Sequence, residues 1–166
     1  MKKHRNWLFI IGVLLVMGVI FYSSSQPYGD QDMRSEIGQV FNRPFWEKAL
    51  SFISFTYAGS EVSVEAIGVP GVIEFFMRKF AHLFVFFCLG FFTVGSLKLL
   101  WKTARFIGLY AFLFVVLYAS LDELHQYFTG DRTPLVQDVM IDSVGGALGI
   151  FFFLRIIQRS NSRKQD

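Results

Sequence analysis

Four long apolar runs, separated by charged clusters, constrain the fold of this 166-residue chain more than any other feature. They cover residues 7–22, 80–100, 106–121 and 139–157. A helix that crosses the hydrocarbon core of a bilayer needs roughly 17–25 mostly apolar residues, and the second and fourth runs reach that length. The first and third runs, of about 16 residues, would extend only about 24 Å as helices. We therefore expect the polar ends of these two runs to enter the membrane slightly.

A soluble, all-helical core is the alternative explanation for any single run. The chain as a whole argues against it, because only 17% of its residues are charged, whereas soluble domains usually carry about 25%. Four helices that are apolar on every side also need lipid, or a much larger protein, to cover them. The sequence therefore predicts an all-α integral membrane protein with four transmembrane helices, forming a single domain over residues 1–166.

The basic residues predict the orientation of these helices. If the N-terminus is cytoplasmic, most of them lie on the cytoplasmic side, as the positive-inside rule requires. A cleaved signal peptide is an alternative for the first run, but no small-residue cleavage site follows it, which favours an uncleaved span. Both termini are therefore predicted to be cytoplasmic, together with the following basic residues: Lys2, Lys3, Arg5, Lys98, Lys102, Arg105, Arg155, Arg159, Arg163 and Lys164.

The segment between the first two runs, residues 23–78, is then predicted to lie outside. Within it, Asp32–Val40 is expected to form a short helix. The apolar residues of 45–53 recur at helical spacing, which predicts an amphipathic helix on the outer surface or an ordinary covering helix. Gly68-Val69-Pro70-Gly71 predicts a turn before the second span. In the fourth run, Gly145 and Gly149 form a small-residue face, which is typical of close helix packing in lipid.

Ionisable and polar residues at membrane depth are costly and by default suggest function. The predicted topology brings three groups of them to the outer end of the bundle. They come from the start of the second span, the end of the third, and the start of the fourth with the turn before it: Arg78, Lys79 and His82; Asp122, Glu123, His125 and Gln126; Arg132, Asp138 and Asp142. We expect these side chains to form one site, although Glu123 in particular could instead be a solvated surface residue.

This ordered set of motifs resembles the VanZ-like family of bacterial membrane proteins. The resemblance rests on Arg78-Lys79-x-Ala81-His82, Asp122-Glu123-x-His125-Gln126, Gly130-x-Arg132 and Asp138-Val139-x-x-Asp142-x-x-Gly145, and Ser24-Ser25-Gln26 also fits. Many members carry a Glu-Tyr pair where this chain has Val85 and Phe86. The resemblance implies a multi-pass protein of the bacterial plasma membrane that acts at the cell envelope. The name-giving protein is associated with resistance to the glycopeptide teicoplanin, and no biochemical activity is established for the family.

Two functions and a structural explanation therefore remain open. The first function is a non-catalytic binding or shielding role at the envelope. The second is enzymatic turnover of a lipid-linked envelope substrate by acid–base chemistry. The structural explanation is that the charged groups neutralise one another and lock the helices together. The candidates for acid–base roles are His82, Asp122, His125, Asp138 and Asp142, and those for ligand binding are Arg78, Lys79, Glu123, Gln126 and Arg132.

Membrane lipid is an expected partner. A lipid-linked envelope precursor or a glycopeptide is a second expected partner. Nucleic acid is not expected to bind. No cofactor is predicted. A divalent cation held by His82, His125, Asp138 and Asp142 is conceivable as a mixed nitrogen and oxygen set. No standard metal-ligand motif supports it, so no metal site is predicted. The oligomeric state does not follow from the sequence.

Overall fold

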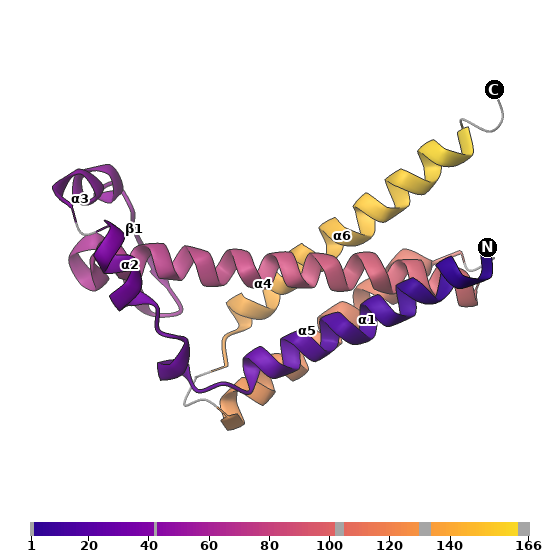
Figure 1. The fold of residues 1–166 in the computed structure, drawn as a ribbon, viewed down its shortest axis with the longest axis horizontal. Helices are drawn as coiled ribbons and strands as arrows, with labels where there is room; N and C mark the ends of the chain where they lie inside the picture. Colours follow the sequence, from indigo (N-terminus) through magenta and orange to yellow (C-terminus); the bar gives the residue numbers. More distant parts are fainter. Residues whose placement is uncertain (1, 42, 102–104, 130–133, 163–166) are drawn as a thin grey trace. The chain divides into compact units, whose positions relative to one another are not determined.

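Helices make up most of the chain (Figure 1). The computed structural model describes residues 2–41, 43–101, 105–129 and 134–162. Its elements, in chain order, are α1 (Lys2–Ser24), η1 (Tyr28–Gln31), α2 (Arg34–Phe41), α3 (Pro44–Leu50), β1 (Ser54–Tyr57), β2 (Ser60–Ser63), α4 (Val64–Leu100), α5 (Ile107–Thr129) and α6 (Val136–Ser162).

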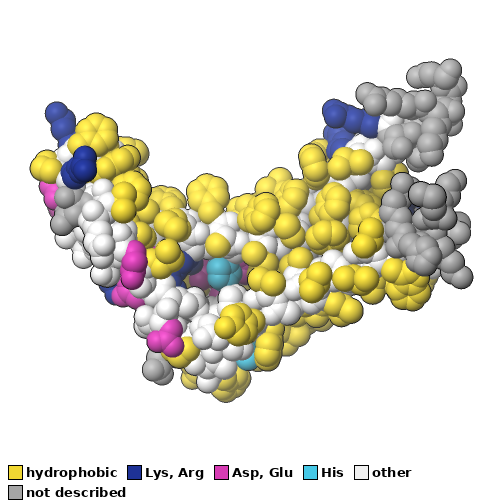
Figure 2. Space-filling model, viewed as in Figure 1, with side chains coloured by type: hydrophobic (Ala, Val, Ile, Leu, Met, Phe, Trp, Pro, Cys, Tyr) yellow, Lys and Arg dark blue, Asp and Glu magenta, His cyan; other side chains and the backbone are white. Residues whose placement is uncertain are grey.

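Four of these helices are long and apolar enough to cross a membrane, as the sequence predicts. The qualifying stretches are Trp7–Ser24, Val64–Leu100, Ile107–Thr129 and Val136–Arg159. Hydrophobic side chains cover most of the visible surface of these helices (Figure 2), and Leu14, Leu117 and Phe151 are all more than half exposed. A surface of this kind suits lipid rather than water.

The helices extend beyond the apolar runs from which they were predicted. The helix α4 begins at Val64 rather than near Phe80, and α5 continues past residue 121 to Thr129. Charged residues end an apolar run but do not end a helix, because Glu, Lys and Arg have good helix propensity. As a result, the polar residues at the ends of the runs lie on helices rather than in loops.

The chain divides into two compact units, and the boundary falls within α4, between Ala81 and His82. Residues 1–26 and 82–166 form the helical bundle, and residues 27–81 form the second unit. In the bundle, α5 packs along both α1 and α6. Its buried core contains one group around Phe86 and Val115 and another around Val94 and Phe153.

Glycines allow α4 and α6 to approach until their backbones touch. A Cβ atom on Gly145 would lie 2.3 Å from the carbonyl oxygen of Leu83, and one on Gly149 would lie 2.0 Å from that of Phe87. On the opposite helix, a Cβ atom on Gly90 would lie 2.2 Å from the carbonyl oxygen of Gly146. These distances are too short for any side chain, so the interpretation of the small-residue face as a packing surface is confirmed.

The second unit contains a β-hairpin that the sequence analysis did not predict. Strand β1 pairs antiparallel with β2, with Tyr57 opposite Ser60. Ala58 and Gly59, which connect the strands, both have positive φ values, 50° and 84°. A two-residue connection with positive φ at both positions matches the twist of a hairpin. Strands of four residues each are too short to show a clear alternating pattern in the sequence.

Two other predictions for this segment can be compared with the structure. The short helix expected over Asp32–Val40 is present as α2, and the helix expected over 45–53 is present as the shorter α3, in which no residue is buried. The predicted turn before the second span is a single non-helical residue, Gly68, with φ of 71°. Pro70 follows it at the start of the continuous part of α4, where proline is tolerated.

Candidate functional site

One end of the helical bundle concentrates buried polar side chains. It is the end at which α1 and α5 finish and α6 begins. His82 of α4, Asp122 of α5 and Asp142 of α6 meet there, and each offers a ligand atom within 4.8 Å of those of the other two. We call these three residues the His–Asp–Asp set. They come from three different helices, so the set exists only in the assembled bundle.

The contact between α4 and α6 positions two members of this set. Gly145 packs against the backbone of Leu83, His82 immediately precedes Leu83, and Asp142 lies about one helical turn before Gly145. The imidazole of His82 is therefore brought next to the carboxylate of Asp142, with Nδ1 3.5 Å from Oδ2. This distance is too long for a good hydrogen bond.

Two acids of this end, Asp142 and Asp122, are buried. The exposed fraction is 1% for Asp142 and 5% for Asp122, whereas the side chain of His82 is 32% exposed. Neither carboxylate oxygen of Asp142 has a hydrogen-bond donor among the residues that the structure describes. Burying an ionised carboxylate without donors costs several kcal/mol or more, so this side chain requires an explanation.

Asp122, in contrast, is held by a hydrogen-bond network. The Nε2 of Gln126 donates to Oδ2 of Asp122 at 2.8 Å and to Oγ of Ser24 at 3.3 Å. Ser24 is the last residue of α1 and is itself buried. The network thus ties the end of α1 to α5 and fixes the orientation of the Asp122 carboxylate.

His125 has different neighbours from His82. Its Nε2 lies 3.0 Å from Oγ of Ser25, and its ring centroid is 4.6 Å from that of Phe21. The Ser25 hydroxyl donates to the carbonyl oxygen of Phe21 at 2.7 Å, so its proton is already engaged and the histidine donates to the serine oxygen. Two histidines therefore belong to this end of the bundle, but only His82 belongs to the His–Asp–Asp set.

Ser24 and Ser25 are polar neighbours of the site that the residue-level prediction missed. Their only signal in the sequence is the Ser24-Ser25-Gln26 motif shared with the family. Hydrogen bonds that join residues 100 and 102 positions apart leave no periodic trace in the sequence. Ser24 and Ser25 can be identified as neighbours of the site only from the packing of α1 against α5.

Glu123 is buried, with 6% of its surface exposed, so the expectation that it could be a solvated surface residue is wrong. Its Oε2 accepts a hydrogen bond of 2.9 Å from the backbone N–H of Leu135, the residue immediately before α6. A carboxylate at a helix N-terminus satisfies an otherwise free N–H and interacts favourably with the helix dipole. Asp138 lies in the first turn of α6 and is half-buried.

Arg78 and Lys79 belong to the second unit, where both have partners. The guanidinium of Arg78 donates to Oε1 of Glu74 at 2.7 Å and to the carbonyl oxygen of Gln31 at 2.7 Å. The Nζ of Lys79 lies 4.6 Å from the centroid of the Tyr57 ring, a cation–π contact. Both cations therefore help to hold this unit together.

A further ion pair of the second unit joins two neighbours in sequence. Hydrogen bonds from Arg34, at the start of α2, lower the pKa of Asp32 from its usual 3.8 to about 2. The Asp32 carboxylate also stabilises the beginning of α2 by accepting the backbone N–H of Arg34 at 3.0 Å. Arg132, the remaining predicted ligand-binding residue, lies outside the described residues.

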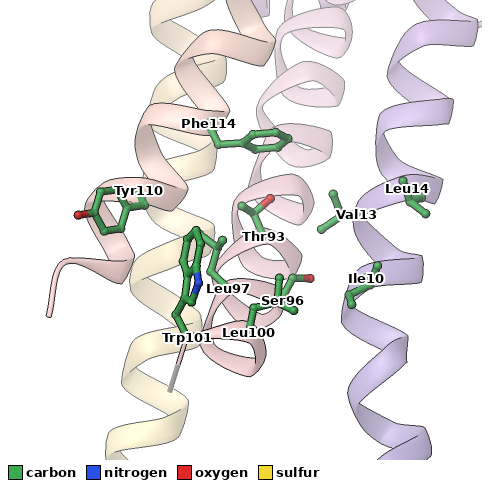
Figure 3. A pocket seen from close by; sticks show the side chains of 10 residues that line it. All are labelled: Ile10, Val13, Leu14, Thr93, Ser96, Leu97, Leu100, Trp101, Tyr110 and Phe114. Atoms are coloured by element: carbon green, nitrogen blue, oxygen red, sulfur yellow. The ribbon is translucent and has the colours of Figure 1, made fainter. Parts of the chain in front are cut away.

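An apolar cavity of about 890 Å³ opens near the other end of the bundle (Figure 3). Residues of α1, the C-terminal part of α4, and the first turns of α5 line it, with Trp101 and Tyr110 side by side at one edge. The hydroxyl of Thr93 is buried here without a hydrogen-bond partner among the described residues. None of the described residues that line this cavity has a side chain suited to acid–base catalysis near neutral pH. These residues therefore do not offer the chemistry of the polar end.

Comparison with known proteins agrees with the motifs that form this polar end. The family model for VanZ/LLP1 matches residues 9–158. The chain belongs to the VanZ/LLP1 family. The matched region includes every predicted site residue and nearly all of the four candidate spans. No curated protein and no solved structure matches the chain.

Proposed function

We propose that this VanZ/LLP1-family protein is a binding or shielding protein of the bacterial cell envelope that reduces susceptibility to glycopeptides such as teicoplanin. Its polar end would face the outside of the plasma membrane, as the distribution of basic residues predicts. There it would bind the polar part of a lipid-linked envelope precursor or of the glycopeptide. Membership of the family supports the envelope role, and the buried polar side chains support a binding site.

The observation that carries this proposal is the unsatisfied carboxylate of Asp142. Most other polar groups at this end have a structural partner: Asp122 binds Gln126, His125 contacts Ser25, and Glu123 accepts the N–H of Leu135. Asp142 has no such hydrogen bond. A buried ionisable group without a hydrogen-bond donor favours a functional explanation over a purely structural one.

A membrane-embedded enzyme is the second candidate function. It is favoured by the position of His82, which is partly exposed and lies beside Asp142. An imidazole next to a carboxylate is suited to general acid–base chemistry near neutral pH. Binding without turnover remains the better-supported function, because His125 and Glu123, two further titratable groups, are already engaged in local hydrogen bonds.

Drug susceptibility tests the proposal directly. A susceptible Gram-positive host would express wild type, Asp142→Asn, His82→Gln or Gln137→Ala, with membrane abundance matched by immunoblot. Gln137 lies on α6 close to the polar end, but its side chain is exposed, so its variant serves as the control. We expect wild type and the control to raise the teicoplanin concentration needed for inhibition, and the two site variants to lose this effect.

Two results would contradict the proposal. Wild type that leaves teicoplanin and vancomycin susceptibility unchanged would remove the glycopeptide role. If the site variants protect as well as wild type at equal abundance, the polar end is not needed for the glycopeptide role. Turnover of labelled envelope lipids by purified wild type, abolished by His82→Gln, would favour the enzymatic function instead.

A further inference from the structure

We infer that the His–Asp–Asp set binds a divalent transition-metal cation, of which Zn²⁺ and Mn²⁺ are the best candidates. The ligands would be His82, Asp122 and Asp142. This inference goes beyond the proposed function, because a resident cation is independent of which envelope molecule the protein binds.

The spacing of the three side chains suits a common metal ion. Atoms that bind one Zn²⁺ at about 2.1 Å lie roughly 3 to 4 Å apart. The ligand atoms of the set are within 4.8 Å of one another, so shifts of less than about 1 Å in the side chains would complete the geometry. The 3.5 Å between Nδ1 of His82 and Oδ2 of Asp142 is too long for a good hydrogen bond but suits two ligands of one ion.

Burial and charge point to a cation independently of spacing. Asp142 is 1% exposed and lacks a hydrogen-bond donor among the described residues. Two buried carboxylates close together repel each other, whereas a divalent cation between them would cancel both charges. A bound metal would therefore offset the unfavourable energy of burying the Asp142 carboxylate without a hydrogen-bond donor.

The surroundings resemble those of other metal ligands. Gln126 donates to Oδ2 of Asp122, and outer hydrogen bonds of this kind orient ligating carboxylates. The side chain of His82 is 32% exposed, which leaves a path by which an ion can enter. One nitrogen and two carboxylate ligands suit Zn²⁺ or Mn²⁺ better than Mg²⁺, which prefers oxygen ligands and retains its water. Three protein ligands would leave at least one position for water or for an oxygen of the bound ligand.

Metal titration of the purified full-length protein in detergent tests this inference. Zn²⁺ would be added after chelator treatment and followed by calorimetry, and Mn²⁺ would be followed by electron paramagnetic resonance. We expect one Zn²⁺ or Mn²⁺ per chain and much weaker binding of Mg²⁺. Loss of an outer hydrogen bond typically lowers metal affinity by about 10–100-fold, and we expect a larger decrease in Asp142→Asn. Gln137→Ala should bind like wild type.

His82→Gln provides a second variant in case Asp142→Asn does not fold, since His82 is less buried. No binding by folded wild type would overturn the inference, as would unchanged affinity in both His82→Gln and Asp142→Asn. Protection against teicoplanin by a protein that binds no metal would leave the proposed function standing and the metal site refuted. Metal binding by a protein that gives no drug protection would support the metal site and refute the proposed function.

Discussion

Single residues at the polar end differ in how their burial is compensated. Asp122 receives a hydrogen bond from Gln126, Glu123 receives one from the backbone of Leu135, and Asp142 receives none from the described residues. All three carboxylates are at most 6% exposed. Three chemically similar side chains of α5 and α6 thus differ in their surroundings, and only Asp142 lacks a hydrogen-bond donor among the described residues.

Replacement of Gln126 by leucine tests the network around Asp122. Gln126→Leu removes the donor to Asp122 and the contact with Ser24. A buried carboxylate left without this donor should cost about 1–3 kcal/mol of unfolding free energy. The measurement is unfolding of the purified protein in mixed micelles of increasing sodium dodecyl sulfate, followed by circular dichroism.

Gln137→Leu is the matched control, because it makes the same chemical change at an exposed position. It should unfold at nearly the same detergent fraction as wild type. If Gln126→Leu and Gln137→Leu unfolded at the same detergent fraction, the Gln126 network would not contribute to the stability of the fold.

Among the helices, the backbone contact between α4 and α6 determines where the site forms. Gly145 and Gly149 meet the carbonyl oxygens of Leu83 and Phe87. These contacts set the axial alignment of the two helices, and with it the meeting of His82 and Asp142. A shift along α6 by one residue would move Asp142 by about 1.5 Å and turn it away from α4.

Gly149→Ala should therefore destabilise the bundle. The added Cβ would lie 2.0 Å from the carbonyl oxygen of Phe87, a backbone atom that cannot move alone. We expect a loss of about 1–3 kcal/mol, as for other overpacked interiors. The loss of unfolding free energy is measured by unfolding in mixed micelles of sodium dodecyl sulfate, as for Gln126→Leu.

Gly18→Ala is the control for this change. Gly18 also lies within a helix, but nothing lies within 4 Å of an added Cβ. Alanine there should leave stability unchanged or raise it by about 0.5–1 kcal/mol through its better helix propensity. If the two variants had the same stability, close packing of α4 on α6 would not hold the bundle together.

For the whole molecule, the orientation in the membrane decides which side the polar end faces. The predicted cytoplasmic position of both termini places residue 60 outside and residue 158 inside. Single cysteines would be introduced at Ser60 and Gln158 in a Cys88→Ser background and labelled in intact cells with a membrane-impermeant maleimide. We expect Ser60→Cys to be labelled directly and Gln158→Cys only after permeabilisation.

Both positions are exposed, so a difference in labelling reports the side of the membrane rather than burial. The reverse pattern would place the polar end in the cytoplasm. In that case an extracellular glycopeptide could not reach it, and the proposed function would be wrong even if the metal site were present.

The sequence by itself determined the helical class, the four candidate spans, the packing face of the fourth span and the family. These properties are local, because hydrophobicity, helical periodicity and motif spacing can be read within one segment. It also identified the residues of the His–Asp–Asp set among a larger group of candidates. It did not identify which of those candidates meet.

Only the tertiary structure decided that His82 joins Asp142 and Asp122, that His125 contacts Ser25, and that Glu123 binds the start of α6. It also revealed the hairpin of β1 and β2. Each of these features depends on contacts between separate segments, and such contacts follow from how the helices and strands align in space. That alignment is set by close packing, above all at the glycines between α4 and α6, and spacing along the chain does not encode it.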